Sequence, residues 1–252
     1  YTAGENGSIT GTATQTVSHG SDGTPVTAIP DAGYHFVKWS DDVTTATRTD
    51  ESVTGNISVT AEFAINVYTL TYTAGENGSI SGTTPQAVSH GSDGTAVTAV
   101  PDTGYHFVKW SDDVTTTTRT DTGVTGDISV TAEFAINTYT VTFKNWNGDE
   151  IKTQTVEHGS GATAPDEPTR EGYHFTGWDV DFSNIVSNLT VTAIFAINEY
   201  TLTYTAGENG SITGTATQAV SHGSDGTAVT AVPDVGYHFV KWSDGVTTAT
   251  RT

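Results

Sequence analysis

The sequence repeats itself, and this feature constrains the possible folds more than any other. The tetrapeptide GYHF begins at Gly33 and returns at residues 104, 172 and 236. The stretch YTAGENGSI begins at residues 1, 72 and 204, with a counterpart at Phe143, and AEFAIN or AIFAIN ends each of the first three copies. The pattern predicts a tandem array of small modules rather than one large domain.

The motif positions predict four modules: repeat 1 (residues 1–66), repeat 2 (67–137), repeat 3 (138–198) and repeat 4 (199–252). Repeat 1 lacks its opening INxYTL strand, and repeat 4 lacks its closing ISVTAEFA strand. The chain contains no methionine and opens within the pattern, so we expect it to be part of a longer protein. A module of this size buries only about 60% of its unfolded surface, so we expect neighbouring modules to abut and stabilise each other.

Within each module the apolar residues follow a period of two. In Val67–Thr73 (VYTLTYT) the tyrosines and leucine alternate with threonines, and Asp127–Ala135 (DISVTAEFA) alternates in the same way. This alternation predicts half-buried strands, and the Asn-Gly and Gly-Ser-Asp-Gly stretches between them predict turns. We expect a mainly β fold with five or six short strands per module, and one short helical turn near Pro165–Arg170.

One aromatic strand, GYHFVKW, recurs in every module and raises the question of whether it binds a ligand or fills the core. Strict alternation places Tyr34 and Phe36 on one face of the strand and Trp39 on the other, with the lysine pointing away from Trp39. Gly177 replaces the lysine in repeat 3 while the tryptophan stays, which favours a core role over a sugar-binding site. The expected structural core residues are Tyr34, Phe36, Trp39, Tyr105, Phe107, Trp110, Tyr173, Phe175, Trp178, Tyr237, Phe239 and Trp242.

Composition narrows the possible partners. Nine basic and twenty-nine acidic residues give a formal net charge of −20, which repels nucleic-acid backbones and anionic membranes. No cysteine is present, so disulfides and thiolate metal sites are excluded. No apolar run reaches the roughly 18 residues of a membrane span. We expect no nucleic-acid partner, no cofactor and no membrane span within these residues.

Two sets of residues raise the possibility of a metal. The eight histidines occupy two repeated places, before Gly in SHG or EHG and inside GYHF, but no fixed third ligand accompanies them, so we favour hydrogen bonding to turns. The acidic pairs Asp41-Asp42 and Asp112-Asp113 are the candidates for calcium. Repeat 4 has Asp244-Gly245 at this place and no D-x-D-x-D-G loop exists, so solvated loop charge is the favoured interpretation.

Catalysis is the least favoured function. Ser, His and Asp are so frequent here that an apparent catalytic set arises from composition alone. No such set is unique to one repeat, and GENGSITG lacks the pattern of a phosphate-binding loop. We therefore expect no enzyme and name no catalytic residue.

The segment Val141–Phe195 resembles the internalin B-type repeat, also called the Listeria–Bacteroides repeat. The resemblance is carried by VTF, by HGSGATAPDEPTREGYHFTGW and by the closing LTVTAIF. The other three modules are similar to a divergent form of this repeat: they lack PTRE and carry a Thr-rich stretch such as DDVTTATRTD. The resemblance implies a small β-grasp-like module, arrayed in tandem on bacterial or archaeal surface proteins, and supplies no catalytic residues.

Three functions follow as hypotheses. The first is a stalk or spacer in a large extracellular, adhesin-like cell-surface protein, in which each repeat contacts its neighbours. The second is a filament, in which copies of the chain associate end to end by strand exchange at their incomplete terminal repeats. The third is direct binding of a glycan or a host-surface protein by the repeats.

Overall fold

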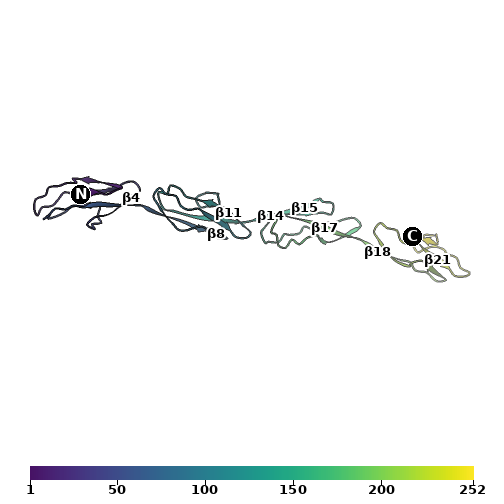
Figure 1. Ribbon diagram of the computed structural model, residues 1–252. Helices are drawn as coiled ribbons and strands as arrows, with labels where there is room; N and C mark the ends of the chain where they lie inside the picture. Colours follow the sequence, from purple (N-terminus) through teal and green to yellow (C-terminus); the bar gives the residue numbers. More distant parts are fainter. The chain divides into compact units, whose positions relative to one another are not determined.

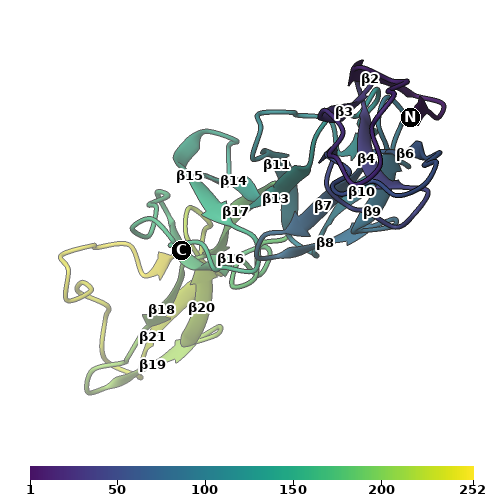
Figure 2. The same cartoon turned by 90° about the vertical axis from the view of Figure 1, so that its left-hand side faces the viewer.

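The computed structural model describes residues 1–252 and contains strands and turns without any helix (Figures 1 and 2). The prediction of a mainly β fold is confirmed. The chain divides into two compact units, Tyr1–Asn137 and Thr138–Thr252. Each unit contains two of the four repeats.

The first unit contains repeats 1 and 2, each with two small sheets. The strands of repeat 1 are β1 (Thr2–Ala3), β2 (Gly7–Gly11), β3 (Val26–Pro30), β4 (Tyr34–Trp39), β5 (Thr47–Arg48) and β6 (Thr60–Ile65), in the orders β1-β6-β4 and β2-β3-β5. The strands of repeat 2 are β7 (Val67–Ala74), β8 (Gly78–Ser81), β9 (Gln86–Ser89), β10 (Val97–Pro101), β11 (Tyr105–Trp110), β12 (Thr118–Arg119) and β13 (Ile128–Ile136), in the orders β11-β13-β7-β9 and β12-β10-β8.

The second unit contains repeats 3 and 4. The strands of repeat 3 are β14 (Thr138–Lys144), β15 (Glu150–Glu157), β16 (Tyr173–Trp178) and β17 (Leu189–Ile197), in one sheet of order β15-β14-β17-β16. The strands of repeat 4 are β18 (Glu199–Thr203), β19 (Gly210–Thr213), β20 (Thr217–Ser221), β21 (Val229–Pro233) and β22 (Thr250–Arg251), in the orders β18-β20 and β19-β21-β22.

The closing strand lies at the centre of a complete repeat. In repeat 2, β13 pairs in parallel with β7 and antiparallel with β11, so both of its edges are hydrogen-bonded. Its inward residues alternate with polar ones, and Ala132 is fully buried. In repeat 3, β17 has the same position between β14 and β16. A strand bonded on both edges and buried on one face holds the rest of the module together.

The aromatic strand departs from strict alternation. In β11 the register against β13 shifts between Phe107 and Lys109, which is a β-bulge. The extra residue turns Trp110 to the same face as Phe107, and the two rings lie 5.9 Å apart. The expectation that the Trp faces away from the Tyr–Phe side was therefore wrong, because one bulged residue reverses the alternation. The same shift occurs in β4 and β16.

The tryptophans of the aromatic strands lie inside the modules. Trp39 and Trp110 are fully buried, Trp242 is 8% exposed, and Trp178 is partly buried. The tyrosines and phenylalanines of the same strands are partly buried, except for Tyr237 of repeat 4, which is exposed. In repeat 2, Trp110 packs with Leu70, Val97 and Val130 in one apolar cluster. Each of repeats 1, 2 and 3 has such a cluster of its own.

Two details of the sequence-based expectation were wrong. Repeat 2 has seven strands and repeat 3 has four, where five or six were expected in each. No helical turn forms near Pro165–Arg170, where the chain is irregular and ends in an isolated bridge between Arg170 and Tyr173. Pro165 and Pro168 explain this, since each removes a backbone donor and disfavours helical geometry in the residue before it.

Candidate functional site

Consecutive repeats within the first unit are joined by a single residue, Asn66, between β6 and β7. The Asn66 amide donates a hydrogen bond to the carbonyl of Gly33 in repeat 1, with N···O at 2.8 Å. The Asn66 carbonyl accepts one from the amide of His90 in repeat 2, also at 2.8 Å. The side-chain Oδ1 of Asn66 lies 2.9 Å from Nδ1 of His35. One residue thus bonds to both repeats, which restricts rotation at the joint.

The imidazole of His90, in repeat 2, packs against Gly33 of repeat 1 at this joint. It lies so close to Gly33 that a Cβ at this position would be 2.2 Å from His90 Cδ2. Gly33 also has φ +84°, a conformation that residues with a side chain rarely adopt. The ring of Tyr68 lies 6.0 Å from that of His90, centre to centre, and supports it. Gly33 therefore allows the two repeats to approach closely.

The second unit contains the same joint between repeats 3 and 4. The amide of Asn198 donates to Gly172, and its carbonyl accepts from His222, both at 2.8 Å. A Cβ on Gly172 would lie 2.2 Å from His222 Cδ2, and Nδ1 of His174 lies 2.9 Å from Oδ1 of Asn198. The joint is therefore a repeated structure with a fixed set of contacts.

These contacts give most of the histidines a structural role that the sequence indicated only in outline. The GYHF histidines His35, His106 and His174 hydrogen-bond to the asparagine that ends their own repeat. The histidines before Gly in repeats 2, 3 and 4 lie beside a tyrosine ring. No group of three or more His, Asp or Glu side chains in residues 1–252 is arranged to hold a metal ion.

The four aspartates considered for calcium bind basic side chains instead. Asp42 and Asp113 pair with Lys38 and Lys109, each at 2.8 Å, on the surface. Asp41 pairs with Arg48 at 2.8 Å, and Asp112 pairs with Arg119 at 3.0 Å. These two arginines had not been singled out from the sequence.

Arg119 is a buried part of the core of repeat 2. Its side chain is 7% exposed and bonds to Asp112 and to Asp121, the latter at 2.6 Å. Its guanidinium carbon lies 5.2 Å from the centre of the Trp110 ring, and the Tyr72 hydroxyl donates to Asp121 at 2.6 Å. Arg48 makes the equivalent contacts with Asp50 and Trp39 in repeat 1. The Thr-rich stretch thus supplies an arginine that covers the buried tryptophan.

This network shifts the pKa values of its members. The hydrogen bond from Arg119 lowers the pKa of Asp112 below its ordinary value. Burial acts to raise the pKa of Asp121, but the hydrogen bonds from Arg119 and Tyr72 outweigh it and leave this pKa lowered. Burial and the bond to Asp50 raise the pKa of Tyr1 to about 12, and burial and the bond to Asp121 raise that of Tyr72. The aspartates therefore stay charged, and the tyrosines neutral, over the physiological pH range.

Repeat 3 has a different aromatic–cation contact on its surface, which sequence reasoning missed. The guanidinium carbon of Arg170 lies 4.2 Å from the centre of the Trp146 ring and 3.6 Å from that of Tyr173. Trp146 is 50% exposed. The signal available in the sequence was that Trp146 and the PTRE segment both occur in this repeat alone.

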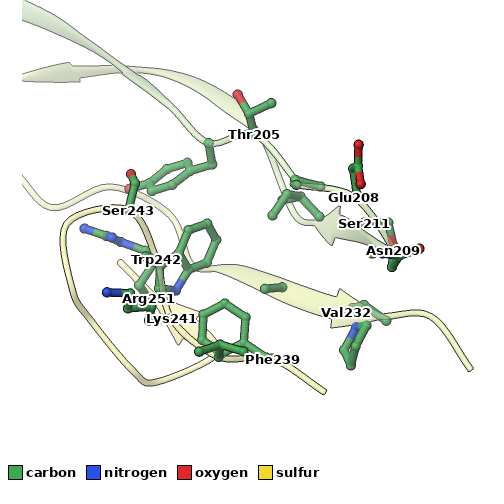
Figure 3. A pocket seen from close by; sticks show the side chains of 18 of the residues that line it. Thr205, Glu208, Asn209, Ser211, Val232, Phe239, Lys241, Trp242, Ser243 and Arg251 are labelled. Carbon is green, nitrogen blue, oxygen red and sulfur yellow. The ribbon is translucent and has the colours of Figure 1, made fainter. Parts of the chain in front are cut away.

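Repeat 4, of which residues 199–252 are given, has a groove between its segments 201–212 and 238–244. The groove has a volume of about 950 Å³ and is lined by residues that include Leu202, Tyr204, Phe239 and Trp242. Figure 3 shows Phe239 and Trp242 close together on one wall and Thr205 on the other. The strand β18 ends at Thr203, and the segment 236–242, which matches β11 in sequence, is not paired as a strand.

Comparison with known protein families accounts for nearly the whole chain. The divergent InlB B-repeat domain matches residues 1–67, 68–138 and 200–252. The Listeria–Bacteroides repeat domain matches residues 139–193. The resemblance inferred from the sequence motifs is confirmed for all four repeats.

Three individual proteins are also similar to this chain in sequence. A protein of Evansella cellulosilytica described as a membrane protein is 28% identical over 84% of this chain and 34% of its own length. A Gly-rich membrane protein of the same organism is 26% identical over 68% of the chain and 21% of its own length. Internalin H of Listeria monocytogenes is 41% identical over 32% of the chain and 15% of its own length.

The chain therefore spans at most about a third of the length of these relatives. Among residues 1–252, no helix is long and apolar enough to cross a membrane.

Proposed function

The chain belongs to the divergent InlB B-repeat family, with one repeat of the Listeria–Bacteroides type, and we propose that it is a structural spacer in a large surface protein. It acts without catalysis and holds another part of that protein, such as an adhesive domain, away from the cell. Relatives described as membrane proteins, and the similarity to internalin H, support an extracellular location at the surface of a bacterial or archaeal cell.

The observation that carries this proposal is the joint between repeats. A spacer keeps its reach only when its modules do not fold back on one another. The joint at Asn66 consists of one residue, hydrogen-bonded to Gly33 on one side and to His90 on the other. Loops of several Gly and Ser residues would instead leave neighbouring modules free to reorient.

The chemistry of the surface is consistent with this role. The net charge of −20 keeps chains apart in solution. Threonines fill the outward faces of strands, as in the Thr27–Thr47 and Thr98–Thr118 pairs, whose hydroxyl oxygens lie 2.8 and 2.9 Å apart. Such faces are stable as strands while presenting polar groups to water.

The spacer role is tested by placing the chain between a cell-wall anchor and an epitope tag on a bacterial surface. We expect antibody access to the tag to exceed that of a Gly/Ser linker with the same number of residues. Shortening the chain to residues 1–137 should reduce access. Equal access for all three inserts would contradict the proposal.

A further inference from the structure

We propose that the contact between Trp146 and Arg170, on the surface of repeat 3, is a binding site for a neutral sugar ring with equatorial hydroxyls, as in β-linked glucose chains. The inference goes beyond the spacer role and does not depend on it, since a ligand on one repeat leaves the joints between repeats unchanged. Its basis is that repeat 3 differs from the other repeats of this chain at both positions that form the contact.

Two positions change together between repeat 3 and the other repeats. Trp146 precedes the turn pair Asn147-Gly148, and the residue before the equivalent pair is a glutamate in the other repeats (Glu5, Glu76 and Glu208). Arg170 precedes the GYHF glycine by two residues, where the other repeats have an aspartate (Asp31, Asp102 and Asp234). The two segments are neighbours in those repeats too, since the amide of Asp102 donates to the carbonyl of Asn77 at 3.0 Å. Repeat 3 therefore has an aromatic ring and a cation where the other repeats have two carboxylates.

The guanidinium of Arg170 lies between two aromatic rings. Its central carbon is 4.2 Å from the centre of the Trp146 ring and 3.6 Å from that of Tyr173, so it lies over a face of each ring. The other three arginines each bind an aspartate, whereas Arg170 forms no ion pair with any carboxylate of residues 1–252. Stacking orients the guanidinium and leaves the N–H groups in its plane available to the oxygen atoms of a ligand.

The indole of Trp146 provides the apolar part of the site. Half of this residue is exposed, whereas the tryptophans of the four aromatic strands are buried or partly buried. When all hydroxyls of a sugar ring are equatorial, they surround its rim and leave C–H groups on both of its faces. Such a face packs against an indole ring, while the hydroxyls at the rim reach polar groups beside it. An exposed ring with oriented donors next to it matches this distribution of apolar and polar groups.

The charges beside the contact favour a neutral sugar over an acidic one. Glu171 follows Arg170, and Asp149 belongs to the hairpin that carries Trp146; both of these acidic residues are exposed. The side-chain amide of Asn147 donates to Asp149 at 2.6 Å and restricts this carboxylate. A sugar hydroxyl donates to a carboxylate and accepts from a guanidinium, so a neutral sugar uses both kinds of group. The two carboxylates and the net charge of −20 repel a sugar acid.

The test titrates the full 252-residue chain with a trimer of β-1,4-linked glucose and follows the indole N–H signals of the five tryptophans by NMR. We expect a saturable shift of the Trp146 signal, with a dissociation constant on the order of 1 mM for so small a contact. The corresponding trimer of glucuronic acid should bind at least about fivefold more weakly at about 0.15 M salt. Absence of a saturable shift with the glucose trimer would overturn the proposal. Equal or tighter binding of the acidic trimer would overturn its assignment to neutral sugars.

The other repeats supply a matched control variant. Trp146→Glu/Arg170→Asp gives repeat 3 the residues that the other three repeats carry at these places, so we expect the fold to accept them. Binding of the glucose trimer should weaken at least about tenfold, with unchanged amide exchange in β14 and β17. Unchanged binding by this variant would place the sugar elsewhere on the chain and refute the proposed site.

A second variant separates the oriented donors of Arg170 from its positive charge. In Arg170→Lys the charge stays, but the planar group that lies between Trp146 and Tyr173 is gone. We expect about fivefold weaker binding of the glucose trimer, again with unchanged amide exchange in β14 and β17. Binding as tight as that of the unaltered chain would contradict the role given to the guanidinium.

Discussion

Replacement of Arg119 by methionine tests whether a charged network stabilises the core of repeat 2. The side chain is 7% exposed, and its loss leaves the carboxylate of Asp121, itself 17% exposed, without its cation. Removing one partner of a buried ion pair typically costs about 3–5 kcal/mol. Asp112 is 40% exposed and can be hydrated in Arg119→Met, and the Tyr72 hydroxyl still donates to Asp121. We therefore expect a loss of unfolding free energy at the lower end of this range, about 3 kcal/mol.

The assay is amide exchange followed by mass spectrometry, because four linked repeats need not unfold in one step. A loss of about 3 kcal/mol corresponds to exchange on the order of 100-fold faster in the most protected amides of β10 and β13. Repeat 3 has no such arginine and serves as the internal control. The exposed pair offers a matched variant, Lys109→Met, for which we expect no measurable change.

A second variant distinguishes the loss of the ion-pair attraction from the cost of leaving the Asp121 carboxylate buried without a cation. In Arg119→Met/Asp121→Asn the unpaired carboxylate is gone, so we expect recovery of about half of the lost stability. Unchanged protection of repeat 2 in Arg119→Met would refute the account of this network as part of the core.

The remaining predictions concern pH, the joint and a buried amide. The pKa values of Asp112 and Asp121 are lowered in the fold, so the stability that these carboxylates contribute is fully present above the unfolded pKa of about 4. This stability is lost as the pH falls through the lower folded pKa values. Acid denaturation of repeat 2 should show the loss, and Arg119→Met should make it smaller. Gly33→Ala should speed amide exchange at Asn66 and His90 far more than Gly236→Ala affects repeat 4, because the two glycines have similar φ but only Gly33 lies against a histidine. Gln86→Ala should lower the free energy of unfolding of repeat 2 by about 1–3 kcal/mol, measured by amide exchange in β9 and β10. The reason is that the buried side-chain amide of Gln86 donates to Thr83 and Thr95 and accepts from Thr95. Unchanged stability would contradict this structural role of Gln86.

The sequence predicted the modules and their β character because repetition and alternation are local signals. The period of two in Val67–Thr73 identified β7, and the recurrence of tryptophan indicated Trp110 as a core residue. Alternation failed in the aromatic strand because the bulge between Phe107 and Lys109 depends on pairing with β13, which lies far along the chain. The spacing of three residues from Phe107 to Trp110 is compatible with a bulge, but it fits strict alternation with Trp110 on the opposite face equally well.

The joint and the buried arginine were not predicted, for a different reason. Gly33 and His90 belong to different repeats, so their contact exists only after both modules have folded. Arginine is usually exposed, so its residue type gave no reason to place Arg119 in the core. One signal was available: repeat 3 lacks this arginine and also has Phe143 in place of the tyrosine that accompanies it elsewhere. The pairing of these changes indicates contact between the two positions.

The central claim is that consecutive repeats are held in one arrangement across Asn66. The chain has no cysteine, so spin labels can be placed by Glu62→Cys and Glu133→Cys, at matching exposed places in β6 and β13. The distance distribution between the labels, measured by pulsed electron paramagnetic resonance, should have a single narrow peak that Gly33→Ala broadens and Gly236→Ala leaves unchanged. A broad distribution in the otherwise unaltered chain would contradict the account, since the repeats would then move freely about the joint.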